Sequence, residues 1–99
     1  MPQGAKATTV WEVSATGRLE RRQWPEASVI YDPDYGQTHL LDTVAATGLR
    51  CLEDEPRSEE ALAREMARRL DVDADPRMRQ YAAELIERLE ALQLIERVP

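Results

Sequence analysis

The first half of the chain alternates between short extended runs and groups of turn-forming residues. Two runs, 10–13 and 18–24, are joined by Ser14-Ala15-Thr16-Gly17, and this spacing predicts two strands around a turn. Residues 28–31 and 37–41 are also rich in β-branched, aromatic or apolar side chains, which favour strands. The turn formers between them are Asp32, Pro33, Asp34 and Gly36. The pattern therefore predicts a second hairpin.

The outer side of strand 37–41 has no obvious partner strand in the sequence. An open strand edge presents unpaired backbone N–H and C=O groups, and an extended peptide can pair with them. The second hairpin therefore predicts a docking edge for a peptide. Gly36 is expected to take a positive φ, because it closes the turn in front of this strand.

Beyond the second hairpin the apolar period lengthens from two to about 3.6 residues, which predicts three helices. The first is expected over 42–52, and the second begins after the capping residue Ser58. The third is expected over 75–93, with Pro76 at its first helical position. The apolar tail 94–98 is expected to pack back on the core.

The order of these elements predicts an α+β fold with one small antiparallel sheet of three or four strands, followed by three helices. This is the element order of a winged-helix domain whose strands come first. Residues 1–9 are small and polar and are expected to form a flexible N-terminus, with 10–98 as a single domain. A chain of 99 residues holds one core, but it is too short for a core together with a deep active-site cleft.

Composition excludes several classes of function. Apolar runs are only a few residues long and the N-terminus lacks the apolar centre of a secretory signal, so we expect a cytoplasmic protein and no membrane partner. His39 is the only histidine and Cys51 the only cysteine, so neither a zinc cluster nor a catalytic triad can be assembled. We expect no enzyme activity, no cofactor and no metal.

Winged-helix domains often bind DNA, so charge decides between two kinds of partner. The net charge of the chain is −6, which repels a phosphate backbone. The third helix is neutral overall, carrying Arg77, Arg79, Arg88, Glu84, Glu87 and Glu90. The only basic cluster is Arg18, Arg21 and Arg22. We therefore expect no nucleic-acid partner; a DNA-binding regulator is the alternative, together with a structural subunit that docks through its apolar tail.

Three stretches of the chain carry short motifs. The first is Val29-Ile30-Tyr31-Asp32-Pro33 with Gly36, Thr38-His39-Leu40-Leu41-Asp42, Ala45 and Leu49, and the next is Ser58-Glu59-Glu60-Ala61-Leu62. The last consists of Met78, Tyr81, Ala82, Leu85, Ile86, Leu89, Leu94 and Ile95. Together they resemble PqqD-like proteins, over roughly residues 18–98.

Two features look most like the branch found beside an HPr-kinase-related protein: the tryptophans Trp11 and Trp24, and the stretch from Tyr31-Asp32-Pro33 to Thr38-His39-Leu40-Leu41. PqqD proper tends to have asparagine where this chain has Asp42, an acidic residue where it has Tyr81, and glycine where it has Gln93.

PqqD-like proteins are peptide chaperones, the leader-recognition elements of pathways that modify ribosomally made peptides (RiPP recognition elements). The resemblance implies that a precursor peptide adds as a strand between 37–41 and the helix 75–93. It also implies that the domain has no catalysis of its own and presents the peptide to a modifying enzyme or an HPr-kinase-related protein. The residues expected to bind the peptide are Thr38, His39, Leu40 and Leu41 on the edge, and Arg77, Tyr81, Glu84, Leu85 and Arg88 on the helix.

Overall fold

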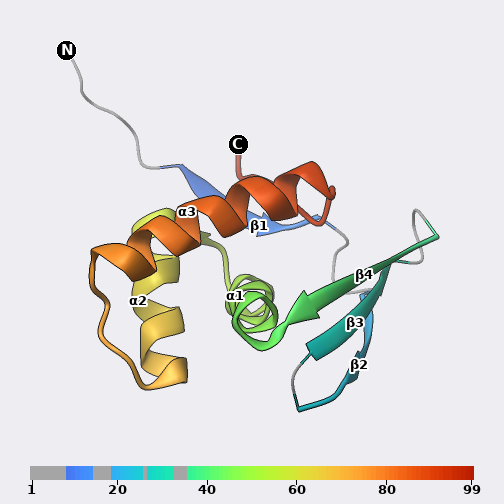
Figure 1. Cartoon of the computed structure of the whole chain (residues 1–99). Helices are drawn as coiled ribbons and strands as arrows, with labels where there is room; N and C mark the ends of the chain where they lie inside the picture. The colour runs from blue at the N-terminus through green and yellow to red at the C-terminus, as the bar shows by residue number, and fades with distance from the viewer. Residues whose placement is uncertain (1–8, 15–18, 26, 33–35) are drawn as a thin grey trace.

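The computed structural model describes residues 9–14, 19–25, 27–32 and 36–99. Most of the expected flexible N-terminus, part of each predicted turn (15–17 and 33–34) and Arg18 lie outside these residues. Within the described part, the chain forms three helices and two three-stranded antiparallel sheets (Figure 1). The predicted α+β class is therefore confirmed.

The hairpin sheet packs its inner face on the first helix. Its strands, in spatial order, are β2 (Glu20–Gln23), β3 (Ala27–Asp32) and β4 (Gln37–Asp42). Ile30 of β3 pairs with Arg21 on one side and His39 on the other. Because side chains alternate between the two faces of a strand, Ile30 and Leu41 reach the inner face, and both are fully buried.

The prediction that residues 10–13 and 18–24 form one hairpin is wrong. The first of these runs lies in a second sheet, whose strands in spatial order are β5 (Arg57–Ser58), β1 (Val10–Val13) and β6 (Ile95–Arg97). Trp11 pairs with Arg57 and Arg97, and the guanidinium carbon of Arg97 lies 5.5 Å from the centre of its ring. This cation–π contact joins the two ends of the described chain.

Each predicted helix is present, and a capping side chain precedes each of them. The helices are α1 (Thr43–Asp54), α2 (Glu59–Leu70) and α3 (Pro76–Ala91). The side chains of Asp42, Ser58 and Asp75 each accept a backbone N–H three residues on, at 2.8, 3.1 and 3.0 Å. These bonds satisfy donors that a helix start leaves unpaired, which explains why the starts were predictable.

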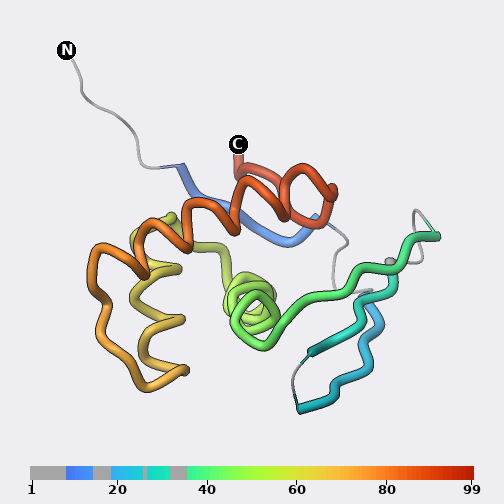
Figure 2. The backbone as a smooth tube through the Cα atoms, in the orientation of Figure 1, coloured from blue at the N-terminus to red at the C-terminus, as the bar shows by residue number. Residues whose placement is uncertain are grey.

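The three helices meet around α1, which lies between α2 and the hairpin sheet, while α3 crosses above it (Figures 1 and 2). Gly48 of α1 permits this close packing, since a Cβ atom there would lie 2.3 Å from Cδ2 of Leu85 and 3.1 Å from Sδ of Met66. Cys51 is fully buried, and burial raises the pKa of its thiol, as expected for an unreactive cysteine.

The end of α3 contains a left-handed residue that glycine would suit. Gln93 has φ 62°; its N–H donates to Glu90 O and the next N–H, of Leu94, donates to Leu89 O, both at 2.9 Å. This is a Schellman motif, in which glycine avoids the strain that a side chain causes at positive φ. Gln93→Gly should therefore stabilise the fold by about 0.5–1 kcal/mol in urea unfolding. Gln80→Gly, inside α3, is the control and should destabilise by about 1 kcal/mol.

Gly36, at the start of β4, has φ 65°, which confirms the predicted positive φ. A Cβ atom there would have no neighbour within 4 Å, so a substitution strains only the backbone. We expect Gly36→Val to lower the free energy of unfolding by about 1 kcal/mol or more. Gly36→Asn, which tolerates this conformation better, should cost less, and equal midpoints for both variants and the parent would contradict this account.

Candidate functional site

The outer edge of β4 carries backbone groups that have no partner strand among the described residues, because β4 is the last strand of its sheet. The hydrogen-bond pattern identifies these groups. Trp24 and Ala27 exchange both backbone bonds, N to O, at 2.8 and 3.4 Å, and bonded pairs alternate along an antiparallel ladder. On β3 the backbone of Ala27 therefore points to β2, and that of Ile30 points to β4.

The same alternation fixes the direction of every residue on β4. His39 pairs with Ile30 and Leu41 pairs with Ser28, so the backbone groups of His39 and Leu41 point to β3. Those of Thr38 and Leu40 point away from the sheet. The free edge that a peptide strand could use thus consists of the N–H and C=O groups of Thr38 and Leu40.

The side chains of the four predicted edge residues divide between the two faces of the sheet. Leu41 is fully buried, and His39 is partly buried on the same inner face. The Nε2 atom of His39 is buried and has no hydrogen-bond partner among the described residues. Thr38 and Leu40 face outward, and Leu40 is 67% exposed. Two of the edge residues, Thr38 and Leu40, thus have free backbone groups. The other two, His39 and Leu41, anchor the strand.

The five α3 residues predicted to bind the peptide lie along one stripe of the helix, here called the helical wall, and this wall borders two cavities. Tyr81, Glu84, Leu85 and Arg88 line a shallow cavity of about 160 Å³. A larger cavity of about 660 Å³ lies toward the start of the helix, and its lining residues are Val44, Asp71, Val72, Asp73, Asp75, Arg77, Met78 and Tyr81. Each of the five wall residues therefore lines at least one of the two cavities, and Tyr81 lines both.

The pKa of the Tyr81 phenol depends in part on a charge at the end of β4. Burial raises the pKa of its phenol, and the negative charge of Asp42 raises it further, while the positive charge of Arg88 opposes the shift. Asp42 ends β4 and caps α1. The phenol of Tyr81 is therefore neutral at physiological pH and lies within electrostatic reach of the β4 terminus.

Sequence reasoning missed six of the residues that line the larger cavity: Val44, Val72, Met78, Asp71, Asp73 and Asp75. Val44 and Met78 lie on helices and are only partly buried. Val72, in the turn after α2, is 52% exposed. Helical spacing could not identify Val44 and Met78 as lining residues, because a residue at the edge of an apolar stripe has the same period as one at its centre.

Neither a metal site nor a membrane-spanning helix is found in the part of the chain that the structure describes. No three acidic, histidine or cysteine side chains in this part of the chain lie together as a metal site. No helix there combines the length and apolar character needed to cross a membrane.

Comparison with known families decides what this arrangement belongs to. The family described as coenzyme PQQ synthesis protein D (PqqD) matches residues 27–95, which is well over half of the chain. The chain belongs to the PqqD family. The match contains β3, β4, all three helices and every predicted site residue, whereas β1 and β2 precede it.

Membership in the PqqD family assigns a general role, that of a peptide chaperone serving a modifying enzyme in biosynthesis. Proteins of this family are accessory domains rather than catalysts. Comparisons with curated proteins and with solved structures found no match. The details of peptide recognition in this PqqD-like chain therefore have to be argued from its own residues.

Proposed function

We propose that this PqqD-like chain binds its precursor peptide as an additional strand along the free edge of β4, beside the wall formed by α3. The observation that supports this mode most directly is the outward direction of the Thr38 and Leu40 backbone groups. Main-chain pairing would supply affinity for an extended peptide without regard to its sequence. The side chains of His39 and Leu41, on the inner face of the sheet, would keep β4 anchored to the core.

The cavities along α3 would accommodate side chains of the added strand and select among them by charge. Three carboxylates, those of Asp71, Asp73 and Asp75, line the larger cavity against one guanidinium, that of Arg77. This excess of negative charge favours a lysine or arginine of the peptide. One carboxylate, that of Glu84, and one guanidinium, that of Arg88, line the smaller cavity beside Leu85, so their charges balance and the cavity favours an uncharged side chain.

The bound peptide would then be presented to a separate modifying enzyme in the cytoplasm, with no catalytic step performed by this chain. An HPr-kinase-related protein is the candidate partner, supported by the branch resemblance that includes Trp11 and Trp24. A tail-docked structural subunit is disfavoured, because Leu94 and Ile95 of the tail are buried in the chain's own core.

Hydrogen exchange of single amides tests the binding mode. Synthetic peptides corresponding to each short reading frame encoded beside the gene would be added to the labelled protein. A binding peptide should slow exchange at the Thr38 and Leu40 amides, because they gain hydrogen bonds, and should leave His39 and Leu41 unchanged. Binding that protects neither Thr38 nor Leu40 would contradict strand addition at this edge.

Binding to duplex DNA distinguishes the chaperone from a winged-helix regulator. Because α3 is neutral and the chain carries a net charge of −6, we expect no measurable binding at physiological salt. Proteins that contact several phosphates nonspecifically reach about 0.1 mM to 1 μM under these conditions. Salt-sensitive micromolar binding to a random duplex in a polarisation assay would favour the regulator instead.

A further inference from the structure

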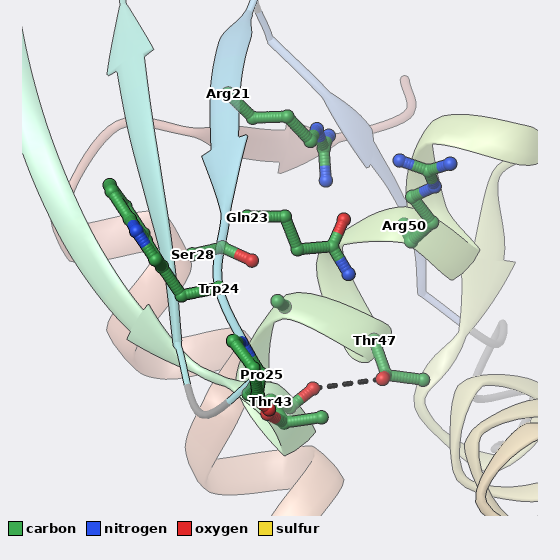
Figure 3. A pocket seen from close by; sticks show the side chains of 9 residues that line it. Arg21, Gln23, Trp24, Pro25, Ser28, Thr43, Thr47 and Arg50 are labelled. Carbon is green, nitrogen blue, oxygen red and sulfur yellow. Dashed lines mark hydrogen bonds between the residues drawn. The ribbon is translucent and has the colours of Figure 1, made fainter.

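A third cavity lies on the side of the hairpin sheet away from the free β4 edge. It has a volume of about 270 Å³ and lies between β2, β3 and α1. Figure 3 shows Arg21 and Gln23 extending from β2, and Thr47 and Arg50 from α1, toward the same space. Its remaining lining residues are Trp24, Pro25, Ser28, Thr43 and Ala46. Four of the nine lining residues precede the region matched by the PqqD family.

The lining of this cavity is polar and positively charged. Among the described residues, two arginines and no aspartate or glutamate line it, in a chain with 19 acidic and 13 basic residues. Ser28, at its floor, is only 2% exposed and is the one polar residue buried in the described part of the chain. A polar floor beneath two guanidinium groups is a suitable environment for an anion.

The two arginines differ in how they are held. Nη2 of Arg21 bonds to Oε1 of Glu53, which fixes this partly buried side chain and leaves other N–H donors of its guanidinium for a ligand. Arg50 is exposed and takes part in none of the ion pairs found among the described residues. No ion pair among those residues therefore neutralises its positive charge.

Two hydrogen bonds connect lining residues at the end of the cavity that Pro25, Thr43 and Thr47 form. Oγ1 of Thr43 donates to the carbonyl oxygen of Pro25 at 3.2 Å, which ties the segment after β2 to the first turn of α1. Within α1, Oγ1 of Thr47 donates to the carbonyl oxygen of Thr43 at 2.8 Å (Figure 3). The volume corresponds to several water molecules at about 30 Å³ each, which is room for an oxyanion group.

We propose that this cavity binds a phosphate or carboxylate group through the guanidinium groups of Arg21 and Arg50 and the amide of Gln23. Arginine pairs with both kinds of oxyanion through two parallel hydrogen bonds. The site is independent of the peptide edge, because β3 separates β2 from β4 in the sheet.

This site can be tested by titrating the labelled protein with sodium phosphate and, separately, with sodium acetate. Sodium chloride keeps the ionic strength constant in both titrations. We expect saturable shifts of the Gln23, Thr47 and Arg50 resonances with at least one anion, and the tighter anion assigns the ligand class. Arg50→Gln should weaken that binding about tenfold or more, since it removes charged hydrogen bonds.

Arg22→Gln is the control, because Arg22 carries the same charge as Arg50 and follows Arg21 on β2, but faces the opposite side of the sheet. It should change anion affinity less than about twofold by charge alone, since exposed charges are screened. Equal weakening in both variants, or no saturable shift with either anion, would overturn the proposal. Neither outcome would affect the peptide edge, which Thr38 and Leu40 form.

Discussion

Thr38→Pro should weaken binding of the precursor peptide about tenfold or more while leaving the chain folded. The Thr38 N–H points away from the sheet, so proline removes no hydrogen bond inside the protein. In the complex, however, the same N–H would donate to the added strand, and the proline ring would stand in its path. The loss of one such bond and the clash together exceed about 1.4 kcal/mol, which is a factor of ten in affinity.

His39→Pro is the control at the neighbouring position. The His39 N–H points to Ile30, so proline there removes a bond of the sheet itself and leaves a buried carbonyl without its donor. We expect it to lower the free energy of unfolding by about 1–3 kcal/mol. Calorimetric titration and urea unfolding of both variants separate the two effects. If Thr38→Pro stayed folded and bound the peptide as tightly as the parent, strand addition to β4 would be wrong.

Leu94→Ala should lower the free energy of unfolding by about 2–5 kcal/mol, the range for removing a buried leucine side chain. Leu94 is fully buried and follows the Schellman motif at the end of α3, where its N–H bonds to Leu89 O at 2.9 Å. Its carbonyl accepts the Ser14 N–H at 2.9 Å, which connects α3 to the strand β1. The substitution leaves these backbone bonds in place, so the loss measures packing.

Val98→Ala is the matched control at the other end of the same tail. Val98 is 37% exposed, although its N–H donates to Val10 O at 2.8 Å, and an alanine keeps that bond. We expect a loss below about 1 kcal/mol in urea unfolding. Similar small losses for both variants would mean that the tail is not part of the core and is available for a partner protein.

The helices of this chain were predictable because the features that start them are local. Each capping side chain lies three residues before the N–H that it accepts, so the cap and the helix can be read in one short stretch of sequence. The hairpin of β3 and β4 was predictable for the same reason, since the two paired strands are consecutive in the sequence and Gly36, with its positive φ, lies directly before β4.

The second sheet could not be predicted in this way. Its strands β1, β5 and β6 come from three distant parts of the chain, and β5 contains only two residues. No short window contains both Trp11 and its partner Arg97, so the sequence offered only the nearer and incorrect pairing of 10–13 with 18–24. Loop closure between distant residues depends on the packing of the whole core.

The sequence by itself determined the helix starts, the open edge of the hairpin and the stripe of α3 residues that was expected to face a peptide. Only the tertiary structure decided which groups on that edge are free, because the backbone directions of Thr38 and His39 depend on the pairing of β2, β3 and β4. It also decided the cavity that Arg21 and Arg50 line. Arg21 and Arg50 are far apart in sequence, and only the packing of α1 under the sheet places their charges beside one space.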